Sequence, residues 1–209
     1  MSAREEVLAR IRGALGNSTE VPDVPRAYRE QGEHAAGSAE LTDQLVDRLE
    51  DYRTSVVRAA DDDDAIGTAI AAALADRGIR DVIAPSGLPP GWLPSGLSAH
   101  IDDGSLGARD LDAIPAVVTG SAVAISETGT IALDGTDLTG RRSASGTVWT
   151  TSAARTTTTC VSGTRVIARR LDPTRPLTFI SGPSATSDIE LDRVEGVHGP
   201  RNLVVVLAG

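Results

Sequence analysis

Residues 55–84 read SVVRAADDDDAIGTAIAAALADRGIRDVIA, and this stretch decides the fold class. Its two ends, Ser55–Ala59 and Ile79–Ala84, are short runs with β-branched residues that predict strands. The Ala-rich run between them predicts a helix that ends near Arg77, just before Gly78. Two strands joined by a helix are typical of a parallel sheet with crossover helices. We therefore expect an α/β protein.

Four consecutive aspartates, Asp61 to Asp64, stand at the start of this helix. A row of carboxylates raises the question of a calcium site. Asp is also a preferred N-cap residue, and the helix dipole favours carboxylates in the first turn. We expect the capping role.

Apolar runs elsewhere in the chain predict the remaining elements. A second helix is expected from about Ala39 to Tyr52, with Leu41, Leu45, Leu49 and Tyr52 on one face. Further elements are expected, in chain order, as strands at Ala116–Ile125, Ile131–Leu133 and Leu177–Ser181, a short helix at about Ala185–Val194, and a strand at Leu203–Leu207.

The N-terminal part of the chain differs from the rest. Ser2 followed by Glu5 has the capping-box spacing, which predicts the start of a helix. Its apolar stripe consists of Val7, Leu8, Ile11, Ala14 and Leu15. Residues 17–39 are polar and contain Pro and Gly, as a linker does. We therefore divide the chain into an N-terminal helix and arm at 1–39 and an α/β domain at 40–209. The helix is expected to dock on its own domain or on a partner.

Composition excludes several classes of function. The net charge of −9 disfavours binding to phosphate backbones, so no nucleic-acid partner is expected. Cys160 is the only cysteine, and the three histidines, His34, His100 and His198, are far apart in sequence. We expect no metal, no iron–sulfur cluster and no other cofactor on this chain. Neither a signal peptide nor a long apolar span is evident, so we expect a cytoplasmic protein.

Three Gly-containing turns, at 126–130, 181–184 and 196–200, hold the polar residues that we consider for a site. Ligands of open α/β sheets bind at the carboxyl ends of strands, where a glycine lets the backbone come close. A helix starting after the second turn would point its N–H groups at a small carboxylate. The candidate catalytic residues are Glu127 and His198, and the candidate ligand-binding residues are Thr128, Gly129, Gly182, Ser184, Thr186 and Asp188.

Each candidate also has a structural interpretation. Ser184 and Thr186 could serve only to cap the expected helix. His198 could be a solvent-exposed turn residue, and Glu127 could hold a structural hydrogen bond. A Walker loop, a dinucleotide-binding motif and a nucleophile elbow are all missing from the sequence, so the turns alone do not specify a reaction.

Five stretches together resemble a known family. ISGPSATSDIE at 180–190 and GVHGP at 196–200 resemble the C-terminal signature of the LUD-domain lactate-utilization protein C family. AISETGT at 124–130 is similar to the central motif of that family. REEVLARIR at 4–12 and VPRAY at 24–28 are similar to its N-terminal part. The resemblance covers most of the chain.

The resemblance implies a Rossmann-like open sheet of the sugar-isomerase and CoA-transferase type. It implies a subunit of an iron–sulfur complex that oxidises L-lactate to pyruvate, with the clusters on two partner subunits. A subunit without a cluster agrees with the single cysteine. A small carboxylate is the candidate ligand.

Residues 143–170 depart from the family pattern, because more than half of them are Ser, Thr or Arg. The family would have a strand and then a helix here. True divergence and a compensated shift of reading frame both fit this composition. We expect poor packing of this segment, since it has little apolar surface to offset the ordering of its backbone.

Two other functions remain open. Residues 126–129, Ser-Glu-Thr-Gly, are similar to the Ser-Glu-Asn-Gly turn that carries the nucleophilic glutamate of some CoA transferases. A stand-alone enzyme would then use Glu127 as its nucleophile. A regulatory or scaffold domain without chemistry is the third interpretation.

Overall fold

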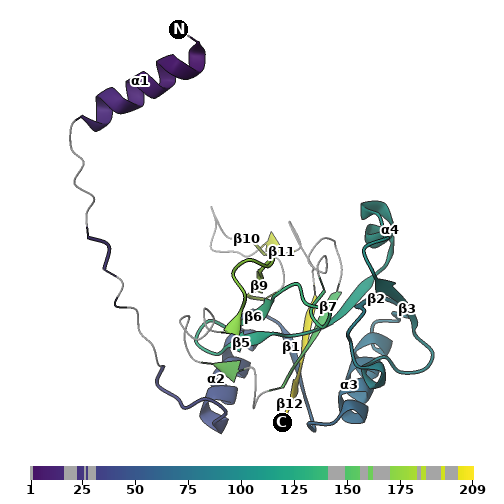
Figure 1. Cartoon of the computed structure of the whole chain (residues 1–209). Helices are drawn as coiled ribbons and strands as arrows, with labels where there is room; N and C mark the ends of the chain where they lie inside the picture. Colours follow the sequence, from purple (N-terminus) through teal and green to yellow (C-terminus); the bar gives the residue numbers. More distant parts are fainter. Residues whose placement is uncertain are drawn as a thin grey trace.

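A computed structural model describes residues 2–16, 23–25, 27, 32–140, 149–155, 160–161, 170–182, 185–186, 194–195 and 202–209. Figure 1 shows the chain as a helix at the N-terminus and a mixed α/β body. The helices are α1 (Ala3–Leu15), α2 (Ala39–Asp51), α3 (Asp63–Ala75), the 3-10 turn η1 (Pro90–Trp92) and α4 (Ala108–Ala113). The strands are β1 (Ser55–Ala59), β2 (Asp81–Pro85), β3 (Ser98–Asp102), β4 (Ala116–Gly120), β5 (Val123–Ile125), β6 (Thr130–Leu133), β7 (Trp149–Arg155), β8 (Cys160–Val161), β9 (Thr178–Ile180), β10 (Ala185–Thr186), β11 (Val194–Glu195) and β12 (Leu203–Ala208).

The main sheet has six strands in the order β1-β12-β7-β4-β2-β3, and every neighbouring pair is parallel. Helix α3 connects β1 to β2, as residues 55–84 predict. The α/β class with an open parallel sheet is therefore confirmed. All parallel strands of a sheet end at the same edge, so the residues after β2, β3 and β4 are brought together there.

Helix α3 covers one face of the main sheet. Ile66, Ile70 and Leu74 of the helix are fully or almost fully buried against residues of β2, β4 and β12. Asp62 is the N-cap, and its carboxylate accepts a hydrogen bond from the backbone N–H of Ala65 at 2.7 Å. The expected capping role of the aspartate run is thus confirmed.

A smaller sheet of four strands, in the order β8-β5-β6-β9, lies beside the main one. Strand β6 runs antiparallel to both β5 and β9. Strands β5 and β9 therefore point in the same direction, and their carboxyl ends share one edge. Helix α2 buries Leu41, Leu45 and Leu49 against β5, β6 and β12, so it packs where the two sheets meet.

Two expectations about the elements are corrected, and two elements were not expected. The expected strand at Ala116–Ile125 is two strands, because β4 belongs to the main sheet and β5 to the smaller one. The expected helix at about Ala185–Val194 is wrong at both ends, where β10 and β11 pair as antiparallel strands. Strand β3 and helix α4 were not expected at all.

The unusual segment at 143–170 contributes a central strand. Strand β7 pairs with β12 on one side and with β4 on the other, from Trp149 to Arg155. A backbone hydrogen-bonded on both sides does not fit the poor packing expected for this part of the segment. The expectation is therefore wrong for 149–155. Residues 143–148, 156–159 and 162–169 lie outside the described part of the chain.

Helix α1 stands apart from the sheets in Figure 1. Its capping box is formed, since Ser2 and Glu5 each accept a hydrogen bond from the backbone of the other. None of its residues is buried, and the exposed fractions of Val7, Ile11 and Leu15 are 56%, 49% and 67%. The apolar stripe therefore has no contact that buries it within the described structure. No described helix is long and apolar enough to cross a membrane.

Candidate functional site

Two of the three predicted turns lie together at the shared carboxyl edge of β5 and β9. The hydroxyl groups of Thr130 and Ser181 form a hydrogen bond of 2.7 Å between the first residue of β6 and the residue after β9. A second hydroxyl contact of 2.7 Å joins Thr128 to Thr130. The turn that carries Glu127 is thus linked by side chains to the turn that carries Gly182.

The carboxyl-terminal half of α2 forms the back of this edge. Ser126 is fully buried and donates a 2.8 Å hydrogen bond to the side-chain carbonyl of Gln44. Gly129 has φ +59°, and a Cβ there would lie 2.8 Å from the Cβ of Arg48. The second turn packs against the same helix in the same way. Gly182 also has a positive φ and contacts the C-terminal end of α2.

Gly182 illustrates why a glycine is required in the second turn. Its φ is +85°, and an added Cβ would lie 2.5 Å from the Cβ of Tyr52. A larger residue would face both an unfavourable backbone conformation and a collision with the helix C-cap residue. The sequence marked Gly129 and Gly182 as ligand-facing glycines, and the structure gives each a packing reason against α2.

The structure brings four of the eight candidate residues to this edge. Glu127 is half-buried, Thr128 is exposed, Gly129 is buried and Gly182 is half-buried. Thr186 lies in β10. The remaining candidates, Ser184, Asp188 and His198, lie outside the described residues.

Two parts of the expected site geometry are corrected. The turns lie at the carboxyl ends of β5 and β9 in the smaller sheet, not at the edge of the parallel sheet. The helix that was expected to present N–H groups to a carboxylate is absent at 185–186, where β10 is found. The helix end that does lie here is the C-terminus of α2, whose dipole is negative and does not favour an anion.

Sequence reasoning missed the residues that α2 supplies to this edge. Gln44, Arg48 and Tyr52 project from a helix that was read only as part of the core. Arg48 is the positively charged residue that α2 places beside the turn at 126–130. Its guanidinium forms ion pairs with Asp47 at 3.1 Å and Asp51 at 3.5 Å. No local sequence pattern links this helix to the turn at 126–130, which lies some eighty residues further along the chain, or to the more distant turn that holds Gly182.

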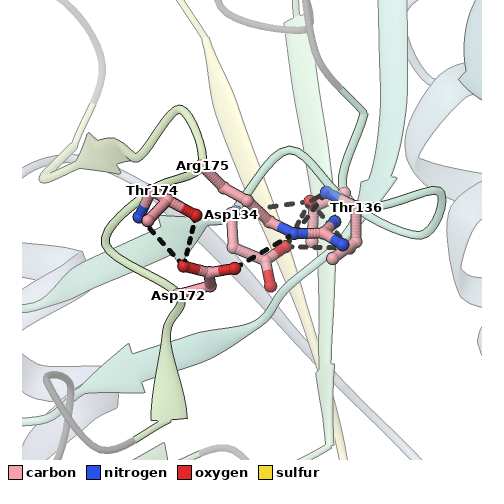
Figure 2. A network of polar contacts seen from close by, with 6 residues as sticks. Asp134, Thr136, Asp172, Thr174 and Arg175 are labelled. Atoms are coloured by element: carbon pink, nitrogen blue, oxygen red, sulfur yellow. Dashed lines mark hydrogen bonds and ion pairs between the residues drawn. The ribbon is translucent and has the colours of Figure 1, made fainter.

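A second polar region lies on the loop after β6 (Figure 2). Asp134 accepts hydrogen bonds from the backbone N–H and hydroxyl of Thr136 and from the hydroxyl of Thr139. Partial burial alone would raise the pKa of Asp134, but the hydrogen bonds from Thr139 and Thr136 outweigh it, and the pKa lies below its usual value. Asp134 is therefore a charged anchor that fixes the loop at 134–140.

The turn at 172–176 packs against this loop. A Cβ on Gly135 would lie 3.3 Å from the carbonyl oxygen of Pro176, and Figure 2 shows the two turns side by side. Asp172 accepts bonds from the hydroxyl and backbone N–H of Thr174, at 2.6 and 2.9 Å. The side-chain hydrogen bond from Thr174 is the main cause that lowers the pKa of Asp172.

A cavity of about 510 Å³ opens at the carboxyl edge of the main sheet, between this loop and the ends of β2 and β3. It is lined by Pro85, Ser86, Asp102, Asp103, Gly104, Thr136, Asp137 and Gly140. The sequence did not point to it, because β3 was not expected. No group of three His, Cys, Asp or Glu side chains suited to a metal is found among the described residues.

Comparison with known proteins identifies the family. The LUD domain model matches residues 108–208. Lactate utilization protein C from Deinococcus radiodurans is 44% identical over 177 residues, which are 82% of this chain and 81% of that protein. The chain belongs to the LUD-domain family. A crystal structure of a DUF162 family protein from D. radiodurans has the same fold, with a TM-score of 0.68 and 36% identity, over 82% of this chain and 98% of that one.

The LUD domain match includes the turn at 126–130, the loop at 134–140 and the turn at 172–176. It does not include α2 or strands β1 to β3. The edge at β5 and β9, which includes α2, and the cavity, which includes the ends of β2 and β3, are therefore each assembled from parts inside and outside the matched LUD domain. The longer similarity to the D. radiodurans protein spans more of the chain than the LUD domain match.

Proposed function

We propose that this chain is a non-redox subunit of an L-lactate-oxidising complex that works in lactate utilization. The observation that carries the proposal is the 44% identity to lactate utilization protein C over 82% of the chain. Similarity at this level along most of both proteins supports a shared role rather than a shared fold alone. The partners we propose are two iron–sulfur subunits.

The proposed chemistry requires an electron acceptor. Oxidation of L-lactate to pyruvate releases two electrons and two protons, and the electrons need an acceptor. Cys160 alone cannot hold a cluster within one chain, since clusters are bound by several thiolates. We propose that the clusters on the partner subunits receive the electrons and that this chain binds no cofactor. Metal analysis of the isolated chain should then find no stoichiometric iron.

We further propose that the edge formed by Glu127, Thr128, Gly129 and Gly182 supports this function. Glu127 is a half-buried carboxylate next to the hydroxyl cluster of Thr128, Thr130 and Ser181. A carboxylate can accept the proton of a substrate hydroxyl or orient it. His198, Ser184, Thr186 and Asp188 complete the proposed site as sequence-based candidates.

Co-purification is the direct test of the complex. The chain is expressed with the two iron–sulfur subunits of its own organism, and lactate-dependent reduction of an artificial electron acceptor is measured. We expect one assembly that reduces the acceptor only when all three chains are present. Full activity without this chain would refute its role as a subunit, and acyl-CoA turnover by the isolated chain would favour the CoA-transferase interpretation.

Glu127→Gln tests the proposed edge within that assembly. The substitution keeps the size of the side chain and removes its charge, so assembly should persist while lactate-dependent activity falls by about tenfold or more. Glu50→Gln is the matched control, because Glu50 is an exposed residue on α2 outside the two turns. Unchanged activity in Glu127→Gln would leave Glu127 a structural role only.

A further inference from the structure

We propose that helix α1 docks into an apolar groove bordered by carboxylates on one of the two iron–sulfur partner subunits. The apolar side chains of α1 recur at three- and four-residue steps, which places them along one side of the helix: Val7, Leu8, Ile11 and Leu15. A helix that binds in a groove presents its anchoring side chains at this spacing. The inference rests on the proposed function, because the proposed complex supplies the partner.

The sequence of α1 defines a helix but gives it no packed face. Ser2 and Glu5 form a capping box at its start, and Gly16 ends it with φ +62°. A helix of 13 residues without tertiary contacts is only marginally stable in water, because most helical stability in proteins comes from packing of the apolar face. Burial of the apolar stripe against another surface therefore stabilises the helix itself as well as the contact.

The surface that covers the stripe is not on the domain of the same chain. No residue of α1 is buried, and Figure 1 shows the helix away from both sheets. Residues 16–38 connect α1 to α2, and a connection of this length spans up to about 75 Å when extended. The connection is thus long enough for α1 to reach the domain, yet no contact in the described structure buries the stripe. The domain of a second copy offers the same surface and is disfavoured for the same reason.

Two arginines beside the stripe indicate the chemistry of the partner. At about 100° per residue, Arg10 and Arg12 fall about 100° to either side of Ile11. Two α1 helices packed through their stripes would bring these arginines together in either orientation, which is repulsive. Carboxylates at the borders of a groove instead form charge-assisted hydrogen bonds with them. The ion pair of Arg10 with Glu6 has both side chains exposed, so it contributes little and can exchange for a partner carboxylate.

An anionic membrane also attracts arginines, but it fits this chain less well than a protein groove. The net charge of −9 opposes adsorption of the whole chain to such a surface. Glu5 and Glu6 add two negative charges on the helix itself. A groove on a protein partner restricts the contact to the stripe and to the arginines beside it.

Binding of the full chain to its two iron–sulfur subunits, purified together, tests the inference by biolayer interferometry. Ile11→Asp places a charge in the middle of the stripe and should weaken binding by about thirtyfold or more, the scale of a central anchor in an interface. Arg12→Glu reverses a charge beside the stripe and should weaken binding by about tenfold. Ala9→Asp, on the opposite side of the helix, is the matched control for the low helix propensity of Asp and should bind within about twofold of the parent chain.

The outcomes separate this inference from the proposed function. If the parent chain does not bind the iron–sulfur subunits, both fail. If the parent chain binds and Ile11→Asp binds equally well, or no more weakly than Ala9→Asp, only the docking of α1 is refuted.

The isolated chain tests the other occupants of the stripe. Light scattering should find no dimer that Ile11→Asp dissociates, and sedimentation with phosphatidylglycerol vesicles should find no binding that Ile11→Asp abolishes. Either effect would assign the stripe to a second copy or to a lipid surface and would overturn the inference. All three variants should keep the parent melting temperature, because no residue of α1 is buried.

Discussion

Thr130 and Ser181 are 51 residues apart in sequence, yet their hydroxyl oxygens lie 2.7 Å from each other. This bond ties the turn of the β5–β6 hairpin to the end of β9. Thr130→Val and Ser181→Ala should each destabilise the chain, and the double variant should reveal a coupling free energy of about 1 kcal/mol. Denaturant unfolding of the four proteins measures it. Thr130→Val combined with Ser98→Ala, on β3 of the other sheet, should be additive.

Gly129 and Gly78 separate backbone strain from steric contact. Their φ angles are +59° and +65°, but a Cβ on Gly129 would meet Arg48 at 2.8 Å, whereas one on Gly78 would meet nothing within 4 Å. Gly78→Ala should cost about 1–2 kcal/mol of unfolding free energy, from strain alone. Gly129→Ala should cost about 1–3 kcal/mol more, since the turn must move away from α2. Equal losses in both variants would show that the contact with α2 is not tight.

Asp134 makes the stability of its loop dependent on pH. Its folded-state pKa is lowered, so its contribution is present above its unfolded pKa of about 3.9 and is lost as the pH falls through the folded value. Asp134→Asn should therefore reduce the change in unfolding free energy between neutral pH and about pH 3. Asp112→Asn, at an exposed site on α4, is the matched control. If the unfolding free energy of Asp134→Asn changed with pH as it does in the parent chain, this assignment would be contradicted.

Helix α1 should be dispensable for folding and required for association. None of its residues is buried, so deleting residues 1–17 removes no packing from the sheets. We expect the deletion variant to keep its melting temperature and to lose affinity for the partner subunits or for itself. Light scattering and co-purification measure the second effect. Loss of the folded state on deletion would place α1 in the core instead.

The sequence predicts the elements that have strong local patterns. Residues 55–84 and the leucines of α2 give the correct helices and strands, because apolar periodicity and caps are local signals. Strand β3 has weak periodicity and lies at the sheet edge, half exposed, so only its pairing with β2 makes it a strand. The break between β4 and β5 could not be predicted from the sequence either, because one continuous apolar run contributes strands to two different sheets.

The candidate site was predicted in part. Glycines after strands indicated the turns at 126–130 and 181–182, and the structure brings these two together. Their contact with Gln44, Arg48 and Tyr52 of α2 depends on tertiary packing, which no local pattern encodes. The acidic cavity was missed for the same reason, since its lining comes from three separate loops. The expected helix at about 185–194 is wrong at its two described ends, because pairing of 185–186 with 194–195 is a contact between separate stretches that no local pattern reveals.

The position of β12 has a consequence for how the chain folds. This strand comes last in sequence, yet it lies between β1 and β7, and Ser55 pairs with Val204. The main sheet therefore remains divided on the ribosome until β12 has been synthesised, because β12 is the described strand that joins β1 to β7. Contacts of such long sequence separation slow folding and leave unpaired strand edges exposed in the meantime. The nascent chain should accordingly need chaperone protection until β12 has been synthesised, and acquire native resistance to protease only after β12 has emerged.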